Sequence, residues 1–440
     1  MQNVNIGIFG FGTVGTGVYR FLNEFYDPST AGIDFRIRAI VDPDLERDRG
    51  IEFDRSLLSN NPSNIFDDPT IDIVVELVGV PGGDYSIPKD IILRALEKGK
   101  HVVTANKALL ARHGWELFRA SENQGKNLYM DASVCGEIPI TTPLRTLQGS
   151  RDISGLEGIV NGTTNYILTL MEQGMDYKDA LRKAQDLGFA EADPSSDVEG
   201  KDARNKLAIL STLAFGNYVY GPKIPVEGIT KIKAIDIEAA KRFGYRIKLM
   251  AIARQQDNGD LEARVTPMLL PKDHALAHVD YENNAIAIYY REEGRNVPYL
   301  QVGKGAGAIP TARAIFRDLV DVARKSMHGE LDVPAGYLSE RYARIRNVGT
   351  IEQPFYIRFL VKDVPRVLAS ISSILSDYAT ASFSGLEQKE SNPGEYTPIF
   401  TTVHPVNTRR LLRAVRIANN LDITPGYPTV KEAIAIPIYN

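Results

Sequence analysis

The chain has 440 residues, which is enough for about three domains with their own hydrophobic cores. Its 55 acidic and 51 basic side chains leave a net charge of −4, so composition gives no electrostatic case for a nucleic acid or an anionic membrane as partner. The single cysteine, Cys135, excludes an intramolecular disulfide and a cysteine-rich metal site. The first residues lack the basic and apolar segments of a signal peptide, and no apolar run is long enough to span a bilayer, so we expect a cytoplasmic protein.

The first 130 residues alternate short apolar runs with helical patterns. Strands are predicted over residues 4–9, 36–41, 72–78 and 101–104, and helices over residues 13–25 and 91–97. Strands that alternate with helices in this way indicate parallel βαβ units, so the expected fold class at this end of the chain is α/β.

The remaining chain divides into two further regions. Helices are predicted over residues 177–187, 202–215, 235–242 and 311–324, with strand-like runs between 261 and 290, an α+β pattern. Residues 326–352 are polar and irregular, as expected of a linker. After the linker, strand, helix, strand, strand, helix and strand are predicted at residues 355–361, 367–378, 381–388, 397–403, 408–418 and 430–438. This βαββαβ order is typical of a ferredoxin-like domain.

The run Gly10-Phe11-Gly12-Thr13-Val14-Gly15 lies between the first predicted strand and the first predicted helix. Gly10 permits a tight turn, Gly12 leaves room for a pyrophosphate, and Gly15 allows helix and strand to pack closely. The helix N-terminus adds unpaired N–H groups and a positive dipole end for the phosphates. This context favours a Rossmann dinucleotide-binding domain over a purely structural turn.

Asp42 ends the second predicted strand, where a carboxylate accepts hydrogen bonds from the adenosine ribose and repels a 2′-phosphate. Arg47 and Arg49 follow closely and offset part of this charge. We therefore expect NAD to be favoured over NADP. The alternative is that Asp42, which precedes Pro43, only begins a turn.

Two lysines and several acids are candidates for catalytic chemistry. Lys107 follows the fourth predicted strand, at the sheet edge where doubly wound folds bind ligands, although a solvated surface charge fits its position equally well. Asp202 and Lys206 lie four residues apart on one helical face, close in sequence to Glu191 and Asp197. Carboxylates beside a lysine suit a small substrate with an ammonium group, and the lysine can exchange a proton with an alcohol oxygen. A solvent-exposed helix salt bridge is the other interpretation.

Together these motifs resemble the homoserine dehydrogenase family over nearly the full chain. The segments that carry the resemblance are GFGTVG at residues 10–15, TANKAL at 104–109, NGTTNYIL at 161–168, GFAEADP at 188–194, DVEG at 197–200, DARNK at 202–206, GAG at 305–307 and PTA at 310–312. The resemblance implies the reversible, nicotinamide-dependent interconversion of L-homoserine and L-aspartate 4-semialdehyde, in the biosynthesis of threonine, methionine and isoleucine.

The resemblance also implies roles for individual residues. Lys206 falls on the family's proton-transferring lysine, and Lys107 falls on its second active-site lysine. The expected substrate-binding residues are Glu191, Asp202, Asp197, Gly162 and Thr163, of which Gly162 and Thr163 lie in a loop of the substrate pocket. The expected cofactor-binding residues are Gly10, Phe11, Gly12, Thr13, Val14, Gly15, Asp42, Lys107, Gly305 and Gly307.

The family's loop for a monovalent cation departs from its usual pattern here. The usual Glu-Ala-Ser-Val-x-Gly-Gly-Ile-Pro run reads Asp-Ala-Ser-Val-Cys-Gly-Glu-Ile-Pro at residues 131–139. The side chain of Asp131 and the backbone carbonyls of Val134, Gly136 and Ile138 still offer oxygen ligands, so they form a candidate sodium site. Cys135 is expected to be a small buried residue and not a nucleophile.

The C-terminal region looks like an ACT domain, a small module that often senses amino acids. Arg366 stands where the common pattern has a glycine that permits close approach of an amino-acid ligand, so the domain either senses a ligand or only pairs with its copy in another subunit. The expected domains are residues 1–130 with about 308–330 for the dinucleotide, 131–307 for substrate and dimerisation, 331–352 as a linker, and 353–440 as the ACT-like domain. The resemblance implies a homodimer or homotetramer.

Two other functions stay open. A reductase of another small aldehyde or hydroxy compound would keep the fold and use the altered loop at residues 131–139 to reshape its pocket. A non-catalytic sensor would bind an amino acid through the ACT-like domain, but the presence of Lys107, Asp202 and Lys206 argues against it.

Overall fold

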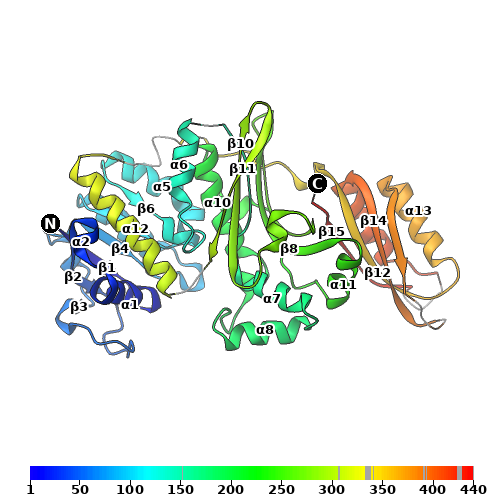
Figure 1. The fold of residues 1–440 in the computed structure, drawn as a ribbon, viewed down its shortest axis with the longest axis horizontal. Helices are drawn as coiled ribbons and strands as arrows, with labels where there is room; N and C mark the ends of the chain where they lie inside the picture. Colours follow the sequence, from blue (N-terminus) through cyan, green and yellow to red (C-terminus); the bar gives the residue numbers. More distant parts are fainter. Residues whose placement is uncertain are drawn as a thin grey trace.

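The computed structural model describes residues 1–150, 152–305, 308–331, 338–339, 341–389, 392, 394–423 and 429–439. Three sheets follow one another along the long axis of the molecule, from the N-terminal region at one end to the C-terminal region at the other (Figure 1). Part of the predicted linker, residues 332–337 and 340, lies outside the described residues. Within the described part of the chain, no helix combines the length and the apolar character that crossing a bilayer requires.

The first sheet has six parallel strands in the order β3-β2-β1-β4-β5-β6. Its strands are β1 (Gln2–Phe9), β2 (Ile33–Val41), β3 (Leu58–Ser59), β4 (Ile73–Glu76), β5 (His101–Thr104) and β6 (Leu128–Tyr129). The helices of this region are α1 (Thr13–Arg20), α2 (Pro28–Ala31), α3 (Ser63–Phe66), α4 (Ser86–Glu97) and α5 (Lys107–Asn123). The strand order is that of a Rossmann sheet, which confirms the α/β fold predicted for this part of the chain.

Helix α12 (Ala308–Met327), far along the chain, packs against α1 of this first region (Figure 1). Its Phe316 ring contacts the rings of Phe21, Tyr26 and Phe35. Burial of this aromatic cluster explains why the chain returns to the first sheet after building the second.

Three elements of this first region differ from the predicted ones. Helix α1 ends at Arg20, and Phe21–Phe25 continue as a π-helical turn. Strand β4 ends at Glu76, because the Glu76 carboxylate accepts the Val78 backbone N–H at 2.7 Å and turns the chain there. The apolar spacing does not predict helix α5, because Gly114, a poor helix former, interrupts it. A side chain at Gly114 would press on Tyr218.

The middle sheet has five antiparallel strands in the order β11-β10-β7-β8-β9. Its strands are β7 (Ile153–Ile159), β8 (Tyr245–Gln255), β9 (Leu261–Pro271), β10 (Asn283–Glu292) and β11 (Arg295–Lys304). The helices are α6 (Thr141–Ser150), α7 (Gly162–Glu172), α8 (Tyr177–Asp186), α9 (Ser195–Val198), α10 (Lys201–Phe215) and α11 (Ala234–Arg242). Helices α8, α10 and α11 match their predicted bounds to within one residue at each end.

The third sheet is antiparallel, in the order β13-β14-β12-β15. Its elements are β12 (Glu352–Lys362), α13 (Val367–Ala379), β13 (Phe383–Gln388), β14 (Tyr396–Asn407), α14 (Thr408–Asn419) and β15 (Val430–Pro437), which confirms the predicted βαββαβ order.

A buried ion pair fixes this third sheet to the middle region. The Arg358 guanidinium on β12 donates to Asp236 at the start of α11 at 2.7 Å and to Glu432 on β15 at 3.1 Å. The Tyr356 hydroxyl donates to the same Asp236 carboxylate at 2.9 Å. Because Arg358 and Asp236 are fully buried, each charge depends on the other to avoid an uncompensated burial cost.

Candidate active site

The glycine loop leaves an open cradle at the N-terminus of α1. Gly10 has φ +91°, and a Cβ there would lie 2.7 Å from the Leu77 carbonyl oxygen, while a Cβ on Gly15 would clash with the Gly10 carbonyl. A Cβ on Gly12 would meet no atom within 4 Å. The first and third glycines are thus required by packing, and the free space at Gly12 suits the phosphates of a dinucleotide.

The remaining loop residues divide between support and lining. Phe11 is fully buried beneath the loop, and Thr13 is exposed at the helix N-terminus. Val14 lines a small pocket described below.

Asp42 lies beside this loop, at the carboxyl end of β2. Its carboxylate accepts the backbone N–H groups of Phe11 at 2.6 Å and Asp44 at 2.9 Å. The Arg49 guanidinium is 3.5 Å from it, and Arg49 Nε donates to the Phe11 carbonyl at 3.0 Å. Asp42 therefore holds the glycine loop and closes the turn to Asp44, while its role toward the cofactor stays a prediction.

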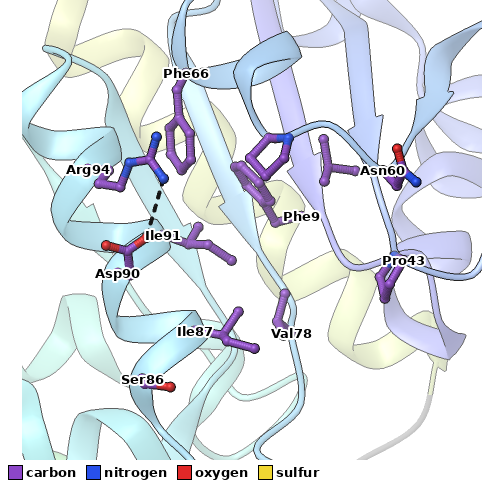
Figure 2. A pocket seen from close by; sticks show the side chains of 12 residues that line it. Phe9, Pro43, Asn60, Phe66, Val78, Ser86, Ile87, Asp90, Ile91 and Arg94 are labelled. Carbon is purple, nitrogen blue, oxygen red and sulfur yellow. Dashed lines mark hydrogen bonds and ion pairs between the residues drawn. The ribbon is translucent and has the colours of Figure 1, made fainter.

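Two neighbouring pockets open at the carboxyl ends of the parallel strands, where Rossmann folds bind their ligands. The larger, of about 550 Å³, is mostly apolar; Phe9 of β1 and Val78, which follows β4, face Ile87 and Ile91 of α4 across it (Figure 2). The smaller, of about 220 Å³, is lined by Val14, Leu77, Val78, Ala105, Asn106 and Lys107, among others. Val78 lines both pockets, which places them on either side of one chain segment.

A fully buried carboxyl group, Glu76, supports the wall between these pockets. It accepts the Val78 backbone N–H at 2.7 Å and the Thr104 hydroxyl at 2.6 Å, and Thr104 Oγ1 accepts the Asn106 backbone N–H at 3.0 Å. Burial raises the pKa of Glu76 to about 7. In the sequence, Glu76 stands out as a lone acid in the middle of an apolar run. Its role in supporting the wall depends on contacts that the sequence does not reveal.

The two candidate lysines share one carboxylate. Asp202 lies 2.9 Å from the Nζ of Lys107, the first residue of α5, and 2.8 Å from the Nζ of Lys206 on its own helix α10. Asp202 and Lys206 are 5% and 7% exposed, so the solvent-exposed salt bridge is the wrong interpretation. The Lys107 side chain is 41% exposed and paired, so it is more than a solvated surface charge.

The charges within this cluster shift one another's titration. Burial works to raise the pKa of Asp202, but Lys107 and Lys206 outweigh it and hold that pKa well below its usual range. The Asp202 carboxylate in turn raises the pKa of Lys107. Burial, with the nearby Asp202, raises the pKa of Asp197. The lysine–carboxylate cluster is therefore ionised at neutral pH at Asp202 and Lys107.

Asn161, which the sequence patterns did not single out, organises the acids. It caps α7 by accepting the Thr164 backbone N–H at 2.9 Å, and its Nδ2 donates to Asp197 at 2.6 Å and to Asp202 at 2.9 Å. The preceding residue, Val160, accepts a hydrogen bond from Lys206 Nζ at 2.8 Å. An asparagine before Gly-Thr-Thr is a recognisable N-cap signal, but its second role requires the tertiary fold.

The expected loop at Gly162 and Thr163 is instead the first turn of α7, because Asn161 caps a helix there. A side chain at Gly162 would lie 2.5 Å from the Glu282 carbonyl, and the Thr163 hydroxyl donates to the Phe189 carbonyl at 2.6 Å. Glu191 is exposed, and its charge contributes to the raised pKa of Lys107.

The loop at residues 131–139 is tied to α12 by two ion pairs. One Asp131 oxygen accepts the backbone N–H and hydroxyl of Thr141 at 3.1 and 3.0 Å, and the other pairs with Arg317 at 2.8 Å. Glu137 pairs with Arg313, one helical turn earlier on α12, at 2.9 Å. Both carboxylate oxygens of Asp131 thus have protein partners, an arrangement that does not fit direct coordination of sodium.

The other expected members of the cation site are backbone groups: Val134 and Ile138 are buried, and a side chain at Gly136 would clash with the Gly305 carbonyl. Among the described residues, no cluster of three or more metal-binding side chains is found. Gly305 lies against this loop, and Gly307 is outside the described residues.

Cys135 is fully buried in this loop, and burial raises the pKa of its thiol to about 12. It is therefore protonated at neutral pH, in agreement with the expected structural role.

The raised pKa of Glu76 predicts a pH-dependent stability. The native state binds this proton more tightly than the unfolded chain does, so its contribution to the free energy of unfolding falls as pH rises from about 4.5 to about 7. Glu76→Gln removes this effect. In urea unfolding, the free energy of unfolding of the wild type should fall by about 2 to 3 kcal/mol relative to that of Glu76→Gln between pH 5 and pH 8. Glu116→Gln, at an exposed position on α5, is the control. If the difference in unfolding free energy between wild type and Glu76→Gln is constant with pH, the assignment is contradicted.

Comparison with known proteins agrees with this geometry. Residues 10–131 match the NAD-binding domain of homoserine dehydrogenase, and residues 139–320 match homoserine dehydrogenase itself. The chain is 41% identical to a homoserine dehydrogenase of Corynebacterium glutamicum (85% of this chain and 83% of that protein) and 35% identical to one of Bacillus subtilis (96% of each). A crystal structure of a homoserine dehydrogenase from Thiobacillus denitrificans superposes with a TM-score of 0.87 at 34% identity, covering 100% of this chain and 99% of that one. The chain therefore belongs to the homoserine dehydrogenase family.

Proposed function

We propose that the chain catalyses the reversible, NAD(P)-dependent oxidation of L-homoserine to L-aspartate 4-semialdehyde. One observation carries the assignment of its active site: two lysines from different helices, α5 and α10, share the buried Asp202 carboxylate, and Lys107 lines the smaller pocket. The relatives named as homoserine dehydrogenases support the reaction. The buried cluster fits proton transfer to an alcohol oxygen better than it fits a non-catalytic sensor, and the named relatives favour homoserine over another small aldehyde or hydroxy compound.

We assign cofactor binding to residues 1–130 and about 308–330, substrate binding to 131–307, and a separate role to 353–440. The larger apolar pocket suits the adenosine, the cradle at Gly12 suits the pyrophosphate, and the smaller pocket suits the nicotinamide. When bound there, the nicotinamide supplies the hydride chemistry. Lys107 at the pocket rim orients the substrate through Asp202 and adds positive charge.

Lys206 is assigned the proton transfer. Its Nζ donates to the Val160 carbonyl and to Asp202, both at 2.8 Å, and an ammonium group has three donors, so a third remains for the substrate oxygen. In the oxidation direction the neutral amine takes the hydroxyl proton; in reduction the ammonium returns it. Asp197 and Glu191 supply negative charge for the substrate's ammonium group, and Asn161 holds Asp197 in place.

The cofactor preference is assigned to NAD. Asp42 places a carboxylate beside the glycine loop, and the side chain of Arg49 is buried against Phe11 instead of projecting toward a 2′-phosphate. The negative charge is therefore the group that a 2′-phosphate would meet.

The positive charge at Asp131 is assigned to Arg317 and not to sodium. The guanidinium lies 2.8 Å from the carboxylate oxygen that does not bind Thr141, so the loop is held without a bound cation.

Subunit pairing is assigned to the middle sheet. Its edge strand β11 carries three exposed apolar side chains, Tyr299, Leu300 and Val302, which an edge strand in solution would not be expected to present. In the ACT-like region, Arg366 adopts φ +76°, a left-handed conformation that favours glycine. Residue 366 thus keeps a backbone conformation typical of glycine, but the arginine side chain blocks the close approach of a ligand. This favours pairing of the region with its copy over ligand sensing.

Replacement of Lys206 tests the reaction itself. Lys206→Ala should lower kcat for L-homoserine oxidation by about 10²- to 10⁴-fold, because proton transfer is lost, while NAD binding measured by fluorescence titration stays unchanged. Lys201→Ala, an exposed lysine on the same helix, is the matched control. Wild-type protein that oxidises L-homoserine with neither NAD nor NADP would refute the proposed function, and a Lys206→Ala variant within a factor of ten of wild type would refute the role of this lysine.

Neutralising Asp42 tests the cofactor preference. Asp42→Asn keeps an oxygen acceptor for Phe11 and removes the charge, so the ratio of kcat/KM with NAD to kcat/KM with NADP should fall on the order of tenfold. Asp48→Asn is a control of equal charge change on the same segment. An unchanged ratio in Asp42→Asn would show that this carboxylate does not select the cofactor.

Removal of sodium tests the role of Arg317. Wild-type activity in N-methylglucamine buffers should stay within about twofold of its value in sodium, because Arg317 already neutralises Asp131. Arg317→Met should lower the melting temperature, and sodium should restore part of the loss. A wild-type enzyme that loses activity without sodium and recovers it on addition would establish a cation site that this arrangement does not account for.

A further inference from the structure

The buried carboxyl group of Glu76 has hydrogen-bond donors around it but no positive charge. Its oxygens accept the Val78 backbone N–H and the Thr104 hydroxyl, and both of these donors are neutral. Asp202 and Asp131, by contrast, are each paired with a lysine or an arginine. Among the described residues no cation forms an ion pair with Glu76, so its negative charge, when present, is not compensated by the protein.

The elements that pack against β4 bring no ion pair to this carboxyl group either. Strand β1 has no ionisable side chain. The ionisable side chains on the other two elements are His101 on β5 and Lys89, Asp90, Arg94 and Glu97 on α4. His101 lies at the opposite end of β5 from Thr104, the strand neighbour of Glu76. Three of the four groups on α4 are in ion pairs with other residues, and the fourth is exposed. Lys107, which follows the β5 strand, is paired with Asp202.

Glu76 lies behind the smaller pocket at the edge of the first sheet. Val78, whose N–H it accepts, lines that pocket, and so does Asn106, whose N–H donates to Thr104 Oγ1. Asn106 Nδ2 also donates to the Val78 carbonyl at 3.0 Å, which joins the two lining segments. The carboxyl group is thus held by both of the chain segments that line the pocket.

We propose that Glu76 makes this pocket selective for the oxidised nicotinamide, whose ring carries a positive charge, over the neutral reduced ring. The inference rests on the proposed function, in which the smaller pocket holds the nicotinamide. An ionised carboxylate behind the pocket attracts a charged ring strongly because little water lies between them, whereas a protonated carboxyl group does not. The bound ring is then the positive partner that the protein itself does not supply.

The selectivity depends on pH, because burial raises the pKa of Glu76 to about 7. The carboxyl group is protonated below this pH and ionised above it, so the preference for NAD⁺ over NADH increases as pH rises. By linkage, binding of NAD⁺ lowers the pKa of Glu76 and releases a proton near pH 7, whereas binding of NADH does not. Groups that interact with the adenosine and the pyrophosphate affect both forms of the cofactor equally and cancel in the ratio of the two affinities.

Calorimetric titration of the full chain with NAD⁺ and with NADH measures this ratio directly. The Kd for NADH divided by the Kd for NAD⁺ should rise on the order of tenfold between pH 6 and pH 8.5 in the wild type. In Glu76→Gln, which resembles the protonated form, the ratio should stay at its low-pH value, and Glu116→Gln should follow the wild type. In buffers of different ionisation enthalpy at pH 7, NAD⁺ should release about half a proton more than NADH in the wild type, and no more than NADH in Glu76→Gln.

Thr104→Val is a second test that leaves the carboxyl group in place. Loss of the hydroxyl donor makes the ionised form less stable, so the rise of the ratio should move to higher pH by about one unit. A ratio that is constant with pH in the wild type, or that rises equally in Glu76→Gln, would overturn the proposal even if L-homoserine is oxidised. A ratio that rises as expected in a protein that does not oxidise L-homoserine would overturn the proposed function alone.

Discussion

The Asp202 carboxylate is the constraint on which the active site depends. A buried carboxylate without a partner is unstable, and Asp202 obtains its partners from two parts of the chain: Lys206 on the same helix and Lys107 from the edge of the first sheet. For the buried Lys206, loss of the partner costs on the order of 3 to 5 kcal/mol. The first and middle regions are thus joined at the candidate active site, and the position of Lys206 follows from that connection.

Helix α12 forms the second connection between the first two regions. Its Phe316 face joins the aromatic cluster of the first region, and its Arg313 and Arg317 hold the loop at residues 131–139 through Glu137 and Asp131. Asp131 and Glu137 are the positions at which the loop departs from the usual family pattern. Each pairs with an arginine of α12, and these two arginines lie one helical turn apart. The departures are therefore compensated within the same chain, by charges on a helix that already lies against the loop.

The sequence allowed local features to be predicted, because they depend on neighbouring residues. The roles of Gly10 and Gly15, the bounds of α10 and the βαββαβ order of the C-terminal region all follow from spacing and turn chemistry. The pairing of Lys107 with Asp202 could not be predicted in the same way, since the two lie on different elements and meet only when the sheets pack together.

The residues missed in the sequence share this dependence on tertiary contacts. Asn161 is recognisable as a helix cap, but its donation to Asp197 and Asp202 requires α7 to lie beside α10. Arg317 reads as an ordinary helix-surface charge until α12 is placed against Asp131. Glu76 is the reverse case, because the residue itself stands out in the sequence as a charge within an apolar strand. Its burial, which raises its pKa to about 7, requires the fold.

Among the described residues, three buried carboxylates at the junctions between regions are stabilised in the same way. Asp202, Asp131 and Asp236 each lie where two regions meet, and each accepts hydrogen bonds from at least two partner residues, which for Asp236 both lie on β12. The arginines that meet two of these carboxylates are less completely paired, because Arg317 Nε and Arg358 Nη2 have no hydrogen-bond partner. Since removal of one partner would leave the other charge buried and uncompensated, each of these junctions depends on both regions being folded.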